Sequence, residues 1–259
     1  MPWHNNTWHV PFFSTTMNLR SILIAGTTSV CVITNANGTS EKELSDSLIQ
    51  VPDSVNVTTQ SATTIERLTE DDYIRAAEEL GVEVAAIKAV VLIEAGHKLN
   101  GFHAPRVPLI NFDLSMFTKA ATRRGIKLNK FKKTHSVVFT RPDKKAYGSY
   151  QEAQHARLTS AMTIDSIAAI EGTFWGMFQI GGFNWKKCGA ESHFDFVDRM
   201  SRSESDQLEL FVKFIQTNKL EKYLKKKDWS SFARIYNGPS YKQRNYHKRM
   251  AAAYRKFSK

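Results

Sequence analysis

Residues 68–96, LTEDDYIRAAEELGVEVAAIKAVVLIEAG, decide the fold. Thr69 has the character of a helix N-cap, acidic residues fill the turn after it, and a first helix is therefore predicted to run to about Leu80. Gly81 breaks the pattern, and apolar residues at steps of three and four predict a second helix from Glu83 to about Ala95. The fold class is therefore expected to be mainly α.

Glu94 ends one apolar stripe of the second helix, after Val84, Ile87 and Val91. Desolvation at the end of an apolar face raises the pKa of a carboxyl group, so that it can donate a proton near neutral pH. The alternative is an ordinary carboxylate that turns to solvent where the helix stops. Position alone favours this second interpretation.

The rest of the folded region is also expected to be helical. Residues 105–113 look extended, and a short helix is predicted around 114–124. Residues 119–145 contain ten Lys or Arg and one acid, which predicts a long, exposed basic loop or hairpin. Further helical patterns cover 150–162, 165–171, 194–200, 204–217, 219–226, 229–236 and 241–257, with a glycine-containing pause at 172–184. These patterns together predict a mainly α domain with a small irregular or β segment.

The N-terminal quarter, residues 1–66, differs from this pattern. Residues 17–36 imitate the three parts of a secretory signal, but sixteen residues precede Met17, so 1–36 is either a signal or a mis-assigned start. Residues 37–66 are polar and read as a linker, which leaves 67–259 as the folded domain. A real signal would send the protein to the periplasm, the cell wall or the extracellular space; without one it stays cytoplasmic until released.

The charge balance points to an anionic partner. The chain has 36 Lys and Arg against 25 Asp and Glu, a formal net charge of +11, which suits nucleic acid, an acidic membrane or an acidic wall polymer. The two cysteines form no metal-type spacing, and the histidines form no HExxH motif, so neither a metal nor another cofactor is expected.

Four segments together resemble a known family. They are the opening stretch, PLINFD at 108–113, YQEAQHARLTSAMTIDSIAAIEGTFWGMFQIGGFNWKKCG at 150–189, and WSSFARIYNGPSYKQRNYHKRMAAAYRKF at 229–257. In order and spacing they are similar to the N-acetylmuramidase domain of phage endolysins, and the resemblance covers residues 68–257. It implies a lysozyme-like helical domain that degrades peptidoglycan, with the small β segment beside the cleft.

The resemblance also implies site residues. Glu94 matches the catalytic glutamate of the family, and residues 176–180 match its cleft-lining Gly-hydrophobic-Gln-Ile segment. Residues 236–238 and Tyr246 match a later cleft segment. The substrate-binding residues expected from this match are Trp175, Gly176, Phe178, Gln179, Ile180, Tyr236, Asn237 and Tyr246.

These residue types suit a glycan. The rings of Trp175, Phe178, Tyr236 and Tyr246 can stack on sugars, Gln179 and Asn237 can bind hydroxyl and acetamido groups, and Gly176 allows a close approach. Trp175, Phe178 and Ile180 fit ordinary core positions equally well.

Some positions depart from the family pattern. Ala95 replaces the usual serine after the glutamate, and Gly172-Thr173-Phe174 replaces the usual Ser-x-Ser segment. Asp113 stands where the family often has glutamate, and it is either a second catalytic group or a structural one.

The expected reaction is hydrolysis of the β-1,4 bond between N-acetylmuramic acid and N-acetylglucosamine, with Glu94 as the general acid. A lytic transglycosylase giving 1,6-anhydromuramic products, a wall-binding protein without activity, and a basic nucleic-acid binder are the alternatives. The expected partners are glycan strands and, through the basic surface, anionic wall or outer-membrane polymers, with no nucleic acid and a monomeric state.

Overall fold

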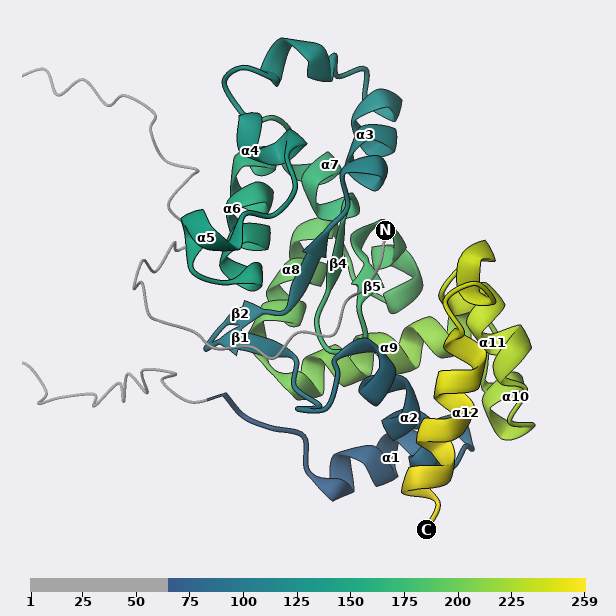
Figure 1. Ribbon diagram of the computed structural model, residues 1–259. Helices are drawn as coiled ribbons and strands as arrows, with labels where there is room; N and C mark the ends of the chain where they lie inside the picture. Colours follow the sequence, from purple (N-terminus) through teal and green to yellow (C-terminus); the bar gives the residue numbers. More distant parts are fainter. Residues whose placement is uncertain (1–64) are drawn as a thin grey trace, which may run out of the picture. The chain divides into compact units, whose positions relative to one another are not determined.

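The structure, a computed structural model, describes residues 65–259 (Figure 1). The predicted signal or mis-assigned start at 1–36 and nearly all of the predicted linker at 37–66 lie outside the described residues. No helix in the described part of the chain is long and apolar enough to span a membrane.

The two helices of the opening stretch form as predicted. Helix α1 is Glu70–Leu80, and the Thr69 side chain accepts a hydrogen bond from the backbone N–H of Asp72 while the Asp72 carboxylate binds the N–H of Thr69. This reciprocal capping box satisfies N–H groups that have no partner within the helix. Gly81 ends the helix with a left-handed φ of 60°, which glycine adopts without steric cost.

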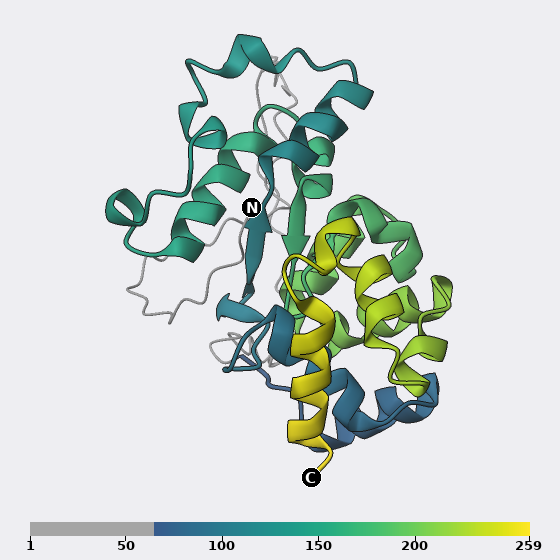
Figure 2. The same cartoon turned by 45° about the vertical axis from the view of Figure 1, so that its right-hand side comes forward.

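Helix α2, Val84–Glu94, is buried on more than the single stripe that the sequence predicts. Ala86, Ile87, Ala89, Val90 and Val91 are all fully buried. The C-terminal helix α12, Tyr246–Phe257, packs along one side of α2, and α1 packs against another (Figure 2). A helix enclosed in this way has to be apolar nearly all round, and this explains its composition.

The expected β segment consists of two small antiparallel sheets. Strands β1, Phe102–Ala104, and β2, Val107–Pro108, form a hairpin. Strands β3, Ile110–Phe112, β4, Thr173–Trp175, and β5, Ile180–Gly181, form a three-stranded sheet in that order. Ile110 faces Trp175 across β3 and β4, so this sheet joins regions that are far apart in the sequence.

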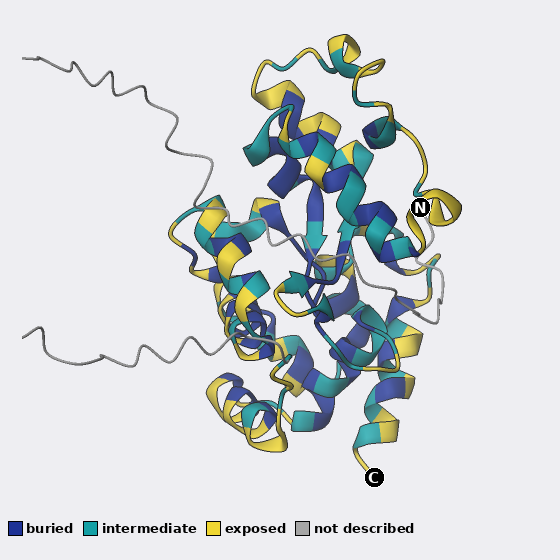
Figure 3. Cartoon of the chain, turned by 90° about the vertical axis from the view of Figure 1, so that its left-hand side faces the viewer, coloured by how far each residue is buried: buried dark blue, intermediate teal, exposed yellow. Residues whose placement is uncertain are grey.

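The remaining elements are helical and lie on two sides of β3 and β4 (Figure 1). On one side are α3 Leu114–Arg123, α4 Ser136–Phe139, α5 Lys144–Tyr147, α6 Tyr150–Met162 and α7 Ser166–Glu171. After β5 come the 3-10 helix Gly182–Cys188, α8 His193–Arg202, α9 Glu204–Thr217, α10 Glu221–Lys225, α11 Trp229–Tyr236 and the 3-10 helix Pro239–Tyr241. The buried residues run through both groups of helices and through the sheet (Figure 3).

The basic stretch at 119–145 is not the open loop or hairpin that the sequence predicts. It continues α3 to Arg123 and then forms short helical turns, one of them Leu128–Phe131. Val138 in α4 is fully buried, and its carbonyl accepts a hydrogen bond of 3.1 Å from Arg157 Nη2. Ile126, Leu128, Val137 and Phe139 also pack against the core, so several apolar residues fold back a segment whose lysines stay exposed.

Buried polar side chains of α6 complete the free edge of β3. The Gln151 amide both accepts from the N–H of Ile110 and donates to its carbonyl, at 2.9 Å each. Gln154 Oε1 accepts from the N–H of Phe112 at 3.2 Å, and Arg157 Nη1 donates to the Phe112 carbonyl at 3.1 Å. These side chains make the hydrogen bonds that a fourth strand would otherwise make, and this explains why they are polar and buried.

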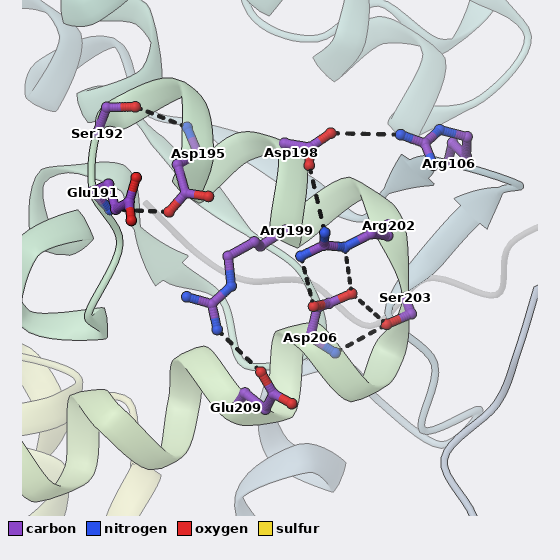
Figure 4. A network of polar contacts seen from close by, with 10 residues as sticks. All are labelled: Arg106, Glu191, Ser192, Asp195, Asp198, Arg199, Arg202, Ser203, Asp206 and Glu209. Atoms are coloured by element: carbon purple, nitrogen blue, oxygen red, sulfur yellow. Dashed lines mark hydrogen bonds and ion pairs between the residues drawn. The ribbon is translucent and has the colours of Figure 1, made fainter.

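The corner between α8 and α9 is held by a polar network (Figure 4). Ser192 and Ser203 cap the two helices through hydrogen bonds of 3.0 Å to backbone N–H groups. Arg202 makes two bonds of 2.9 Å to Asp206, and Arg106 in the β1–β2 turn lies 3.6 Å from Asp198. Ser203 lies at the corner, whereas Ser192 caps the far end of α8. Since exposed ion pairs contribute little, the Ser203 cap, at about 1 kcal/mol, stabilises this corner most.

Candidate active site

Glu94 is the last residue of α2 and is half-buried. It follows three turns of largely buried helix, and the chain turns away after it at Gly96, where φ is 81°. The C-terminal end of a helix carries a partial negative charge, which disfavours the ionised form of a carboxyl group there. Both the burial and the helix therefore favour a neutral Glu94.

Asn237 binds this carboxyl group. It is the C-cap residue of α11, and its Nδ2 donates a 2.7 Å hydrogen bond to Glu94 Oε1. Burial raises the pKa of Glu94 to about 7, against a smaller lowering by this hydrogen bond and by the positive charge of Arg249. The Oδ1 atom of Asn237 is buried and accepts no hydrogen bond from the described residues.

Tyr236 and Tyr246 complete the surroundings of Glu94. Burial raises the pKa of both phenols above the usual range, and the negative charge of Glu94 raises it further. The Tyr236 hydroxyl donates a 2.7 Å hydrogen bond to the carbonyl of Phe178. Three elements, α2, α11 and α12, thus bring together four of the residues that the sequence predicts for the site.

The segment 176–180 forms a tight turn before β5. Gly176 has a φ of 69°, and Gln179 has a φ of 46°, a conformation that residues other than glycine adopt rarely. The Gln179 amide donates a 2.7 Å hydrogen bond back to the Gly176 carbonyl, and its Oε1 is buried without a partner among the described residues. The Tyr236 bond to Phe178 joins this turn to α11.

Trp175, Phe178 and Ile180 are core residues. Trp175 and Ile180 are each 3% exposed, and Phe178 is 0% exposed. The Trp175 ring donates a 3.2 Å hydrogen bond to the Ile170 carbonyl, and the Phe178 ring stacks on Phe211 with centroids 4.1 Å apart. The structure gives Trp175 and Phe178 a packing role instead of the predicted sugar stacking, because enclosed rings have no face left for a sugar. Tyr246 is also nearly enclosed, at 3%.

Asp113, predicted as a possible second catalytic group, caps a helix in the structure. It is the N-cap of α3, and its Oδ1 accepts a 3.0 Å hydrogen bond from the N–H of Met116. Its own N–H donates to the carbonyl of Gly172 at 2.8 Å. These contacts make Asp113 a link between α3 and the start of β4.

Sequence reasoning missed two residues that act on the site. Arg249 lies over the Tyr246 ring, with 5.6 Å from its guanidinium carbon to the ring centroid. Its spacing of three residues from Tyr246 on a helix is the signal that could have identified it. Gln207 in α9 is fully buried and accepts a 2.8 Å hydrogen bond from the N–H of Met177, and no local sequence signal indicates it.

The arrangement can perform acid catalysis. A carboxyl group with a pKa near 7 is largely protonated below neutral pH, and Asn237 fixes the direction of one of its oxygens. Within residues 65–259 the side chain of Glu94 makes no second hydrogen bond, and the one it makes is through Oε1.

Comparisons with known proteins agree with this geometry. The model of the family described as Muramidase, N-acetylmuramidase, matches residues 83–258. The crystal structure of the Burkholderia AP3 phage endolysin is similar, with 35% sequence identity and a TM-score of 0.61 over 74% of this chain and 71% of that chain. The search of curated proteins gave no match.

Proposed function

Because this chain belongs to the N-acetylmuramidase family and is a peptidoglycan hydrolase, we propose that Glu94 is the general acid that cleaves the glycan strand. The bond is the β-1,4 linkage between N-acetylmuramic acid and N-acetylglucosamine. The observation that carries the proposal is the half-buried carboxyl group of Glu94, held by Asn237 and with a pKa raised to about 7.

The proposed reaction uses Glu94 twice. The protonated carboxyl group gives its proton to the glycosidic oxygen as the bond to C1 of the muramic residue breaks, and a neutral hydroxyl group leaves on the other sugar. A water molecule then adds its oxygen to C1, and the Glu94 carboxylate takes a proton from that water. Glu94 regains its starting state, and one water molecule is consumed for each bond.

The contacts of Asp113 support a structural role over a catalytic one. Its carboxylate already accepts the N–H of Met116 in α3, and its own N–H binds the carbonyl of Gly172, which directly precedes β4, so neither partner lies in the elements around Glu94. We therefore propose that Asp113 holds α3 in place, and that Gln179, Asn237 and the tyrosines contribute the polar surroundings of the bound glycan.

The direct test is Glu94→Gln in a wall-clearing assay, since glutamine keeps the shape of the side chain and removes its transferable proton. We expect the rate to fall about 100- to 10 000-fold, the usual contribution of general acid catalysis. Glu78→Gln, at an exposed position of α1, is the matched control and should clear walls at the normal rate. Normal clearing by Glu94→Gln would refute the assignment.

The released fragments decide between two uses of the same acid. Hydrolysis yields a reducing muramic end, whereas attack by the 6-hydroxyl of the muramic residue yields a 1,6-anhydro end with one water less. We expect reducing ends in the mass spectrum, and a majority of anhydro ends would reassign the chemistry to transglycosylation.

A further inference from the structure

The positive charge of the chain is concentrated in two segments, residues 119–145 and residues 219–259 at its C-terminal end. Residues 219–259 contain 13 Lys and Arg against 2 Asp and Glu, an excess equal to the formal net charge of +11 for all 259 residues. This segment includes α11 and α12, which place Asn237, Tyr236 and Tyr246 beside Glu94. The acid therefore lies next to one of the two basic segments of the molecule.

Arg249 is the basic residue whose charge reaches Glu94. Its guanidinium lies over the Tyr246 ring, and the residue is exposed. It forms no salt bridge with the residues that the structure describes, whereas Lys227, which precedes α11, pairs with Glu83. The ring fixes one face of the guanidinium and leaves the N–H donors at its edge without an acidic partner.

In the free enzyme this charge opposes the role of Glu94. A nearby cation stabilises a carboxylate and so lowers its pKa, which reduces the fraction of Glu94 able to donate a proton. Such a cation stops opposing acid catalysis only if another anion pairs with it when the substrate is bound.

The substrate itself can supply the missing anion. The muramic residue bears a lactyl group on O3, two carbons from the anomeric carbon at which the bond breaks. The lactyl carboxyl is either free or extended by a stem peptide that carries free carboxylates. An acid that protonates the glycosidic oxygen therefore has a carboxylate of the same muramyl unit in its vicinity.

Resting on the proposed function, we infer that Arg249 is a specificity-determining residue that binds a carboxylate of the muramyl unit at the bond being cut. The planar guanidinium fits a carboxylate with two parallel hydrogen bonds, and stacking on Tyr246 presets its orientation. Once the carboxylate is bound, the charge of Arg249 is neutralised, and Glu94 is more fully protonated in the complex than in the free enzyme.

The experiment compares three glycan substrates with the full-length protein. The first consists of strands with their stem peptides, the second of the same strands with all carboxyl groups converted to methylamides, and the third of strands freed of peptide, which keep only the lactyl carboxylate. Each is digested by the unaltered chain, by Arg249→Gln and by Arg255→Gln, an exposed arginine further along α12 that serves as the matched control.

We expect the unaltered chain and Arg255→Gln to have a kcat/KM about 10- to 100-fold higher for the carboxylate-bearing strands than for the amidated ones. Arg249→Gln should cleave the carboxylate-bearing strands and the amidated strands at similar rates. If only the third substrate has the advantage, the carboxylate bound is the lactyl one, because the stem peptide converts that carboxyl group to an amide in the first. If only the first has it, the carboxylate belongs to the peptide.

Two results would overturn the inference: no advantage for carboxylates in the unaltered chain, or an equal advantage in Arg249→Gln. Failure of the proposed function looks different, because Glu94→Gln would then cleave all three substrates as fast as the unaltered chain.

Discussion

At the scale of single residues, Glu94 shows how burial keeps a carboxyl group protonated at a pH where it would ordinarily be ionised. A carboxyl group with an ordinary pKa of 4.5 is moved to about 7 chiefly by burial, which corresponds to about 3 kcal/mol against the ionised form. The folded state binds the proton more tightly than the unfolded state does. Ionisation of Glu94 therefore does not change the free energy of unfolding below about pH 4.5. It lowers that free energy as the pH rises, and the loss reaches its full size above about pH 7.

This sign gives a prediction for Glu94→Gln. Glutamine resembles the protonated acid, so the variant should match the unaltered chain in free energy of unfolding at pH 4 and exceed it by about 3 kcal/mol at pH 8. Denaturant unfolding at a series of pH values measures the difference. Glu78→Gln should show no such trend, and a Glu94→Gln variant that is less stable at pH 8 would contradict the assigned environment.

At the scale of elements, Gln207 ties α9 to the turn that precedes β5. Its amide accepts the N–H of Met177 at 2.8 Å and donates to the carbonyls of Met200 at 2.7 Å and Gly101 at 3.3 Å. A Cβ atom on Gly176 would lie 2.6 Å from Gln207 Oε1, so only glycine allows this approach. One side chain thus positions the turn that bonds to Tyr236.

We therefore expect Gln207→Leu to be strongly destabilising, although leucine is apolar and similar in size. It leaves the buried N–H of Met177 without its partner and removes the bonds to the carbonyls of Met200 and Gly101, of which the second keeps the N–H of Leu109, at about 1 to 3 kcal/mol for each group left unpaired. Thermal or denaturant unfolding should show a loss of about 3 to 5 kcal/mol. Gln216→Leu, further along α9 with an exposed bond to Glu79, is the control and should change stability by less than about 1 kcal/mol.

The elements also show what the sequence can and cannot predict. The bounds of α1 follow from Thr69 and Gly81, because caps act within a few residues. The role of Gln154 depends on a strand about forty residues earlier, which no local pattern reveals. Motifs identified Glu94 and Asn237, but an aromatic motif does not tell whether a ring such as that of Phe178 faces the cleft or the core.

At the scale of the whole molecule, the separation of charge should govern the encounter with anionic walls. Screening shortens the reach of these charges from about 10 Å in 0.1 M salt to about 3 Å in 1 M salt. Two segments carry an excess of positive charge: residues 119–145, with ten Lys and Arg against one acid, and residues 219–259, with 13 against 2. Only the second contributes elements beside Glu94, so attraction that brings a wall to the acid should act mainly through α10 to α12.

The prediction compares two variants with the same change in net charge. Replacing the exposed Lys226, Lys242 and Lys248 by glutamine should slow wall clearing several-fold at low salt and flatten its dependence on salt. Replacing the exposed Lys119, Lys130 and Lys132, in and after α3, should have a much smaller effect. Clearing rates across a salt series measure both, and equal effects would mean that net charge matters and its location does not.

The pairing of α6 with β3 has a consequence for molecules that crowd together on a surface. An uncovered strand edge is a template on which neighbouring chains can add strands and aggregate. Here the outward N–H and carbonyl groups of Ile110 and Phe112 are already occupied by Gln151, Gln154 and Arg157, so this side of the sheet offers no such template. The three side chains therefore protect the molecule from intermolecular sheet formation. Their replacement by apolar residues would leave the edge of β3 unpaired and make the protein prone to aggregate.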